Sequence, residues 1–294
     1  MSNVSLRWAR SADGRARWLP ALGLLPFFIY VAVFLIEPTI EVAVGAFQNN
    51  DGTWTNGNVS ALFDTIELRA LWHSVELSVS SSVIGGVLGT VLAAAIVMLP
   101  ATNLLRRVSL ALCSVFSQFG GVTLAFMFLA TFSATGAVTV WLKTIFGSAP
   151  TDDWLFTVAG FAVVYLYFQI SLMVIVILPA LEGIRTEWGE AASSLGASWW
   201  QYFRQVLIPI LSPAFLGSLL LLFANAFAAY ATAAALTDQG QIILPLIIRS
   251  SISSEVALGH QHLAYAVAFE MVIVVGLVMT AYSLLLRRTR KWLA

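Results

Sequence analysis

Six long apolar runs, separated by short polar segments, constrain the fold of this chain more than any other feature of its sequence. Only 10% of its 294 residues are charged and 59% are hydrophobic, whereas soluble domains carry roughly 25% charged residues. A helix crosses a bilayer in about 20 apolar residues. We expect six such spans, at 18–40, 73–98, 108–133, 154–180, 208–236 and 263–286. The sequence therefore predicts an all-α polytopic membrane protein.

The distribution of lysine and arginine predicts how these spans are oriented, because the cytoplasmic loops of membrane proteins carry an excess of both residues. If the spans alternate in direction, three basic residues lie on one side of the membrane: Arg69, Lys143 and Arg249. Twelve lie on the other side: Arg7, Arg10, Arg15, Arg17, Arg106, Arg107, Arg185, Arg204, Arg287, Arg288, Arg290 and Lys291. We therefore expect both termini in the cytoplasm. An odd number of spans would destroy this asymmetry.

The apolar runs divide the chain into one appended N-terminal helix and a five-helix core. We expect a cytoplasmic N-terminus and first span at 1–41, an extracytoplasmic loop at 42–72 and a transmembrane core at 73–294, with a cytoplasmic loop at 181–209. The run Ala137–Phe146 is too short to span a bilayer. It predicts an interfacial or re-entrant helix on the outer side.

A polar, tryptophan-rich segment, EAASSLGASWWQYFRQVLIP from Glu190 to Pro209, separates the fourth and fifth runs. Thr186 can cap a short helix with Glu187 and Glu190 in its first turn, where the helix macrodipole favours acidic side chains. Gly196 permits a sharp bend because it has no side chain. The segment thus predicts two short helices across the cytoplasmic ends of the spans. They either dock into a groove of a partner or lie among lipid headgroups as an amphipathic hairpin.

The order Glu190-Ala191-Ala192, then Gly196, then Val206-x-Ile208-Pro209 resembles the "EAA loop" of ABC-importer permeases. The resemblance implies that this loop docks on a separate ATPase subunit. The docking residues that it implies are Glu187, Glu190, Ala191, Ala192, Gly196, Val206, Ile208 and Pro209. Isoleucine and leucine are usual where Val206 and Ile208 stand, and both replacements keep the anchor apolar.

The resemblance extends more loosely from His73 to the C-terminus and implies a bacterial inner-membrane permease that is not itself an enzyme. Two ATPase subunits would bind ATP and Mg²⁺, so no cofactor is expected in this chain. A second permease subunit, identical or different, would complete the pathway through the lipid. An extracytoplasmic solute-binding protein would deliver the cargo. The formal net charge of zero gives no indication of nucleic-acid binding.

Polar residues inside the apolar runs are candidates for the translocation pathway. A carboxylate within hydrocarbon is costly, so we expect Glu270 to face protein or water. It either lines the pathway and helps to bind a cation, or it pairs with an internal donor or reaches the outer interface. Gln169, Asn225 and Tyr230 are further candidates, although polar side chains also hold membrane helices together.

The cargo is predicted from a narrower resemblance. The appended first helix and the stretch at 225–230, NAFAAY, look similar to permeases of the spermidine/putrescine group. Glu37, Glu41 and Glu76 lie near the outer ends of their spans and are compatible with a cation. A polyamine-like organic cation is therefore expected, with iron, thiamine and aminoethylphosphonate as alternatives.

Rows of small residues predict close helix packing in lipid. One such row lies on the second span: Ser81, Gly85, Gly89 and Ala93. Another lies on the fifth: Ala224, Ala228 and Thr232. Sliding of helices along these rows during transport is a further hypothesis.

The sequence gives no indication of a metal or catalytic site. Cys113 is the single cysteine and lies in an apolar run, which favours a small buried side chain. His260 and His262 could share a metal, but with no third ligand nearby a solvated loop pair is expected. Two other classes stay open. An ion-coupled secondary transporter would show repeated halves and broken helices, and an intramembrane enzyme would need clustered catalytic side chains.

Overall fold

The computed structural model describes residues 18–49, 51–147, 154–236, 243–253 and 261–290. Most of this described backbone is helical, and its one extended pairing is an isolated bridge between Gln48 and Trp54. Six helical stretches are long and apolar enough to cross a membrane, which confirms the predicted all-α fold with six candidate spans. His260 lies outside the described residues, as do several of the counted basic residues: Arg7, Arg10, Arg15, Arg17 and Lys291.

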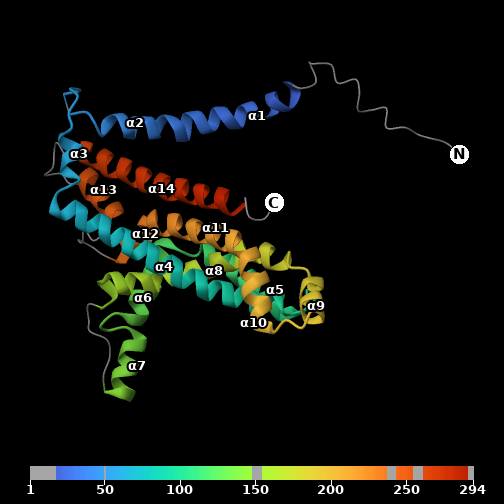
Figure 1. The fold of residues 1–294 in the computed structure, drawn as a ribbon. Helices are drawn as coiled ribbons and strands as arrows, with labels where there is room; N and C mark the ends of the chain where they lie inside the picture. Colours follow the sequence, from blue (N-terminus) through green and yellow to red (C-terminus); the bar gives the residue numbers. More distant parts are fainter. Residues whose placement is uncertain (1–17, 50, 148–153, 237–242, 254–260, 291–294) are drawn as a thin grey trace.

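The first span is a long helix at the edge of the bundle (Figure 1). It consists of α1 (Trp18–Val31), a π-helical turn η3 (Ala32–Ile36) and α2 (Glu37–Gly45). Its most apolar stretch, within Gly23–Gly45, is not buried inside the protein, so the side chains of that stretch face the surroundings. Its apolar character is that of a helix solvated by lipid.

The end of α2 is held against the start of α14 (Gln261–Arg290). The Nδ1 atom of His262 lies 2.9 Å from the carbonyl oxygen of Gly45. A Cβ at Gly45 would lie 2.5 Å from the ring of Tyr265, so only glycine permits this approach. His262 is therefore half-buried in a helix contact, and the expectation that it lies in a solvated loop is wrong.

The centre of the bundle is the contact between α4 (Thr65–Val97) and α8 (Val158–Glu182), which follows a short turn η4 (Trp154–Phe156). A Cβ at Gly85 would lie 2.8 Å from the Cβ of Gln169, and one at Gly89 would lie 2.5 Å from the Cβ of Met173. The two backbones come this close because α4 carries small, buried residues along this face. The predicted packing row at Ser81, Gly85, Gly89 and Ala93 is thereby confirmed.

Two of the predicted spans are each broken into separate helices. The run at 108–133 contains α5 (Leu104–Gln118) and α6 (Gly121–Phe132). The run at 208–236 contains α11 (Ile208–Phe227) and α12 (Tyr230–Leu236). The prediction of one continuous helix in each run is wrong, because hydropathy records the surroundings of a segment and not the continuity of its helix. The small-residue row predicted on the fifth span is interrupted by the second break, because α11 ends at Phe227 and α12 begins only at Tyr230.

Beyond the first break, α6 leads through a turn into α7 (Ala137–Phe146), which has the bounds predicted for a short helix. The stretch Gly121–Phe146 is the third candidate span, in place of the one predicted at 108–133. Figure 1 shows α6 and α7 leading away from α4 and α8. Whether α7 lies at the outer interface stays a prediction.

The segment between the first two spans is shorter than the loop predicted at 42–72, because α2 continues to Gly45 and α4 begins at Thr65. It contains the short helix α3 (Gly57–Ala61). Close to it lies α13 (Leu244–Ser253), whose first amide donates a hydrogen bond of 2.9 Å to Ser74 Oγ on α4. These elements share a buried apolar cluster with α14.

The two ends of the bundle are built differently (Figure 1). At one end lie the start of α1, the end of α14, and the helices α9 (Thr186–Ser194) and α10 (Trp199–Tyr202). At the other end lie α3 and α13. This arrangement agrees with an even number of spans. The cytoplasmic location of the first end stays a prediction.

Candidate functional site

The tryptophan-rich segment at 186–209, which we call the elbow, begins directly after α8. Helix α9 starts at Thr186, and Arg185 rather than Thr186 is its N-cap, without a side-chain capping bond. Glu187 lies in the first turn of α9, and Glu190 follows in the second. The prediction that Thr186 caps this helix with both glutamates in the first turn is therefore wrong by one residue of register. Glu187 still lies where the macrodipole favours it.

Gly196 forms the bend between the two helices, as predicted. Its φ angle is +76°, which is a left-handed conformation that glycine adopts without steric cost. The Gly196 amide bonds to the Ser193 carbonyl at 3.0 Å, and the Ala197 amide bonds to the Ala192 carbonyl at 3.0 Å. This pair of bonds is a Schellman motif, which satisfies the last carbonyls of α9. The bend is thus a defined turn.

The second arm of the elbow starts with a capping box. Ser198 Oγ accepts a bond from the Gln201 amide at 3.3 Å, and Gln201 Oε1 accepts one from the Ser198 amide at 2.7 Å. From there α10 continues through a π-helical turn, η5 (Phe203–Leu207), directly into α11. Proline at 209 lacks the amide that an α-helix needs, and the wider turn lies just before it. The second arm is therefore the first part of a span and not a separate short helix.

The elbow presents large apolar side chains to its surroundings. Leu195 is 88% exposed and Trp199 is 71% exposed, and Trp188 and Trp200 are also exposed. The rings of Trp199 and Trp200 both stack on Phe203, with centroids 5.3 and 5.7 Å apart. Stacking fixes these rings in place, so the apolar surface has a defined shape. Contiguous exposed apolar surface of this kind marks a contact with another protein or with a membrane.

All eight predicted docking residues belong to the elbow by their place in the sequence. Six of them are exposed, and Ala192 and Val206 are half-buried. The exposed six are Glu187, Glu190, Ala191, Gly196, Ile208 and Pro209.

A second feature is a pocket of about 500 Å³ between the two helix breaks. The amide of Gly121, the first residue of α6, donates a hydrogen bond of 2.8 Å to Thr232 Oγ1 on α12. Across the second break, Tyr165 on α8 donates its hydroxyl proton to the Ala229 carbonyl at 2.6 Å. These bonds partner backbone groups that the breaks release from the helices. Residues from both breaks, including Gln118, Gly120, Ala228 and Ala231, line the pocket.

The four predicted pathway residues fall into two groups. Asn225 and Tyr230 line the pocket between the breaks together with Phe168. Gln169 does not line it, because its side chain is fully buried and donates a bond of 2.8 Å to the Leu222 carbonyl. Within the described residues its Oε1 atom has no hydrogen-bond partner. Gln169 thus joins α8 to α11.

Glu270 lies outside this pocket. Its Oε2 atom is buried and has no hydrogen-bond partner among the residues that the structure describes. The adjacent Met271 lines a second, mainly apolar pocket of about 450 Å³, and Tyr230 borders both pockets.

The described residues contain no group of three or more His, Cys, Asp or Glu side chains that could hold a metal ion. Cys113 is buried in the apolar cluster between α5 and α8, as its sequence context predicts.

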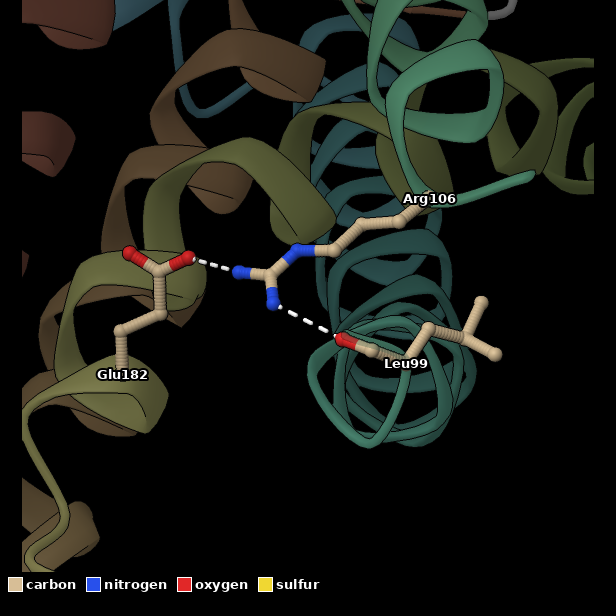
Figure 2. Close-up of polar contacts among 3 residues, drawn as sticks. All are labelled: Leu99, Arg106 and Glu182. Atoms are coloured by element: carbon tan, nitrogen blue, oxygen red, sulfur yellow. Dashed lines mark hydrogen bonds and ion pairs between the residues drawn. The ribbon is translucent and has the colours of Figure 1, made fainter. Parts of the chain in front are cut away.

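Sequence reasoning missed one polar cluster beside the elbow. Arg106 on α5 forms an ion pair with Glu182, the last residue of α8, and also donates to the Leu99 carbonyl at 3.0 Å (Figure 2). Arg106 was counted only as a cytoplasmic charge. Since the two partners are 76 positions apart in the sequence, no local pattern links them.

Comparison with known proteins identifies the family. A family model described as "Binding-protein-dependent transport system inner membrane component" matches residues 16–293. The chain belongs to this family. The match covers almost the whole chain and includes the elbow.

Individual relatives of the family are more distant. The chain is 25% identical to the putative ferric transport system permease protein FbpB 1 of Haemophilus influenzae over 209 residues, which are 70% of this chain and 32% of that one. It is 38% identical to the sulfate transport system permease protein CysT of Escherichia coli over 103 residues, or 35% of this chain and 34% of that one. The chain thus spans about a third of the length of these two relatives. Their names refer to ferric iron and sulfate, and give no support to a specific resemblance to spermidine/putrescine permeases.

Solved structures share the fold. A chain in the crystal structure of a bacterial ABC transporter involved in the import of the acidic polysaccharide alginate matches with a TM-score of 0.75 and 20% identity, over 93% of this chain and 96% of that one. A chain of the MetNI methionine ABC transporter in an inward-facing conformation matches with a TM-score of 0.55 and 17% identity, over 76% and 95%. At these identities the matches concern the fold alone.

Proposed function

We propose that this protein is the permease subunit of an ATP-driven importer in a bacterial inner membrane. It would form part of the pathway for a small polar solute, while separate ATPase subunits hydrolyse ATP. A second permease subunit and an extracytoplasmic solute-binding protein would complete the assembly. Membership of the family supports this proposal, and the elbow is the observation that carries it.

The elbow fits a protein partner better than a lipid surface. Its acidic residues Glu187 and Glu190 are exposed on the first arm, and the rings of Trp199 and Trp200 are exposed on the second. Interfaces between proteins combine aromatic anchors with a polar rim in this way. A helix lying on a membrane would instead be rich in lysine and arginine on its polar face, whereas Arg204 is the only basic residue between Thr186 and Pro209.

The elbow is connected so that its displacement moves two spans. Three residues separate α8 from α9, and α10 runs without interruption into α11. Farther along these helices, Phe168 on α8 and Asn225 on α11 line the pocket between the breaks. A partner that shifts the elbow on binding ATP would therefore change the shape of this pocket. Such rigid-body movement is a common means of transmitting a local change.

In the proposed importer the cargo passes through the pocket between the breaks. The side chains that line this pocket would bind a cargo by hydrogen bonds rather than by ion pairs. Ser117, Gln118, Asn225 and Thr232 supply polar side chains, and the described residues that line it include no charged one. An organic dication such as a polyamine would need carboxylates. The polyamine-like cargo therefore stays a prediction that these walls do not support. Iron, thiamine and aminoethylphosphonate stay as alternatives.

The two helix breaks also favour a second candidate, an ion-coupled secondary transporter. Transporters of that class bind their substrates where helices are discontinuous. The elbow has no role in such a mechanism. Dependence of transport on ATP rather than on an ion gradient separates the two candidates.

The test is assembly of the full chain with candidate ATPase subunits from the same bacterium, each co-expressed with it in turn. We expect the wild-type chain to retain one of these ATPases during purification in detergent. Combining Gly196→Trp with Glu190→Lys should abolish co-purification, because a bulky side chain at the left-handed position distorts the bend and the lysine reverses a charge on the docking surface. Gly147→Trp is the matched control, since Gly147 also has a positive φ of +68° and open space around it, but lies after α7.

Full retention of the ATPase by the doubly substituted chain would refute docking through the elbow. Equal loss with the Gly147 control would assign the effect to general misfolding. Transport that persists after ATP depletion but stops when the ion gradient collapses would favour the secondary transporter.

A further inference from the structure

Arg106 joins three elements at the end of the bundle that carries the elbow (Figure 2). It lies in the first turn of α5, donates one hydrogen bond to the Leu99 carbonyl just beyond α4, and forms an ion pair with Glu182 at the end of α8. The side chain of Arg106 is only 13% exposed, whereas that of Glu182 is 45% exposed. A guanidinium group can make both contacts because its donors form a rigid, planar fork.

Each of the two charges lies at the helix end that disfavours it. Helix macrodipoles favour anions at the N-terminus and cations at the C-terminus. Arg106 is a cation near the N-terminus of α5, and Glu182 is an anion at the C-terminus of α8. Neither charge supports its own helix, so the contribution of both to the fold comes from tertiary contacts, namely their ion pair and the bond from Arg106 to the Leu99 carbonyl. This points to a role in holding α5 against α8.

The ion pair fixes what the apolar contacts of α5 leave free. Cys113 of α5 is buried in a cluster with Met173 and Ile177 of α8, and Phe116 lies against Tyr167 with ring centroids 5.1 Å apart. Apolar contacts are non-directional and permit sliding. Charged hydrogen bonds have a defined geometry and set the axial register of the two helices.

The far end of α5 reaches the pocket between the breaks. Ser117 and Gln118, its last two residues, line that pocket. At the near end, Glu182 is separated from the first residue of α9 by only three residues. One helix therefore runs from the base of the elbow to the pocket, and the ion pair is its attachment at the elbow.

We infer that Arg106 is a positioning residue of the proposed importer, which makes α5 follow α8 when the partner ATPase moves the elbow. This inference rests on the proposed function. It adds a third moving helix, α5, to the two that are covalently joined to the elbow. Without the ion pair, α8 and α11 would still move with the elbow, but α5 would lag behind and the pocket would not change shape on its α5 side.

The test measures movement at the pocket without requiring the cargo. Cys113→Ala removes the single cysteine, and Ser117→Cys places a reporter in the pocket wall. The full chain is assembled with its second permease and ATPase subunits in lipid nanodiscs. The rate of labelling by a water-soluble maleimide is compared without nucleotide and after trapping with ATP and vanadate. We expect this rate to change on trapping in the otherwise unaltered complex.

Arg106→Gln and Glu182→Gln should each abolish the nucleotide-dependent change in labelling while the ATPase stays bound. The exchanged pair, Arg106→Glu with Glu182→Arg, should regain it, because the exchange restores the ion pair and puts each charge at the helix end that favours it. Arg107→Gln is the matched control, since it removes an exposed positive charge one residue away. Arg107→Gln should label as the unaltered complex does.

The outcomes are distinguishable. Failure of the unaltered chain to bind the ATPase would refute the proposed function itself. With the ATPase bound, three results would each overturn the inference: no labelling change in the unaltered complex, a retained change in both glutamine variants, or no recovery in the exchanged pair. Loss of the nucleotide-dependent labelling change in Arg107→Gln would also overturn the inference, because the effect would then come from removing any positive charge in this region and not from the ion pair.

Discussion

At the scale of single residues, the tightest packing in this protein depends on glycine. Gly85 and Gly89 let α4 approach α8 so closely that added Cβ atoms would lie 2.8 and 2.5 Å from side-chain atoms of α8. A row of small residues on an apolar helix was sufficient to predict this contact, because close approach is the usual reason for such a row in lipid. Its partner could not be predicted, since α8 contributes ordinary larger residues, Gln169 and Met173.

Gly89→Ala tests this packing. The new Cβ would lie 2.7 Å from the Ile170 carbonyl oxygen as well as near Met173, and backbone cannot move aside as a flexible side chain can. We expect the free energy of unfolding to fall by about 1–3 kcal/mol, measured as a lower apparent melting temperature in detergent. Gly276→Ala on α14 is the control, since nothing lies within 4 Å of its added Cβ. Equal melting temperatures for the two variants would contradict the role assigned to Gly89.

At the scale of elements, the helix breaks are the feature that hydropathy could not predict. Neither break is marked by proline or by a charged residue, so the sequence predicts one run where the structure has two helices. The adjacent glycines 120 and 121 were the available signal for the first break, since Gly121 has a φ of +74°. Ala228 and Ala229 at the second break carry no comparable signal. The break there depends on tertiary contacts, such as the bond from Tyr165 to the Ala229 carbonyl.

Thr232 should matter because it links the two breaks. Thr232→Val keeps the shape of the side chain but removes the acceptor for the Gly121 amide. The Gly121 amide is half-buried at the pocket, so losing its partner costs about 0.5–1.5 kcal/mol, and we expect a lower apparent melting temperature than for the wild-type chain. Thr232→Ser retains the hydroxyl and should stay close to wild type. A valine variant as stable as the serine variant would show that the bond is not required.

The elbow was predictable because its signals are local. The Glu190-Ala191-Ala192 sequence, the single glycine and the proline lie within twenty residues, and the Schellman turn and capping box are formed by neighbours in the chain. Arg106 and Glu182 meet only because α5 folds back along α8. Their positions at disfavoured helix ends were visible in the sequence only once the helix bounds were known. The four candidate pathway residues were predicted from their polarity alone. Of these, Asn225 and Tyr230 line the pocket between the breaks, whereas Gln169 and Glu270 do not.

At the scale of the whole molecule, the arrangement of its two ends predicts how it sits in the membrane. The elbow, the start of α1 and the end of α14 share one end, and most of the basic residues were assigned to that side. We expect green fluorescent protein fused after Ala294 to fluoresce, as it does only in the cytoplasm, and alkaline phosphatase inserted after Gly147 to be active, as it is only outside. A dark fluorescent-protein fusion together with an inactive phosphatase insertion would show the opposite topology. The elbow would then lie outside the cytoplasm, where no ATPase could reach it.

Helix α4 also has a consequence for the opposite face of the membrane. Its 33 residues span about 50 Å, whereas the hydrocarbon core is about 30 Å thick. Even at a tilt of about 20°, a helix of this length exceeds the hydrocarbon core by about 17 Å, or about three turns, and its N-terminal part is held by α13 and by the segment that follows α2. A macromolecule that binds from that side would therefore first meet a rigid helix end in a fixed position rather than a flexible loop, and could orient itself on that end.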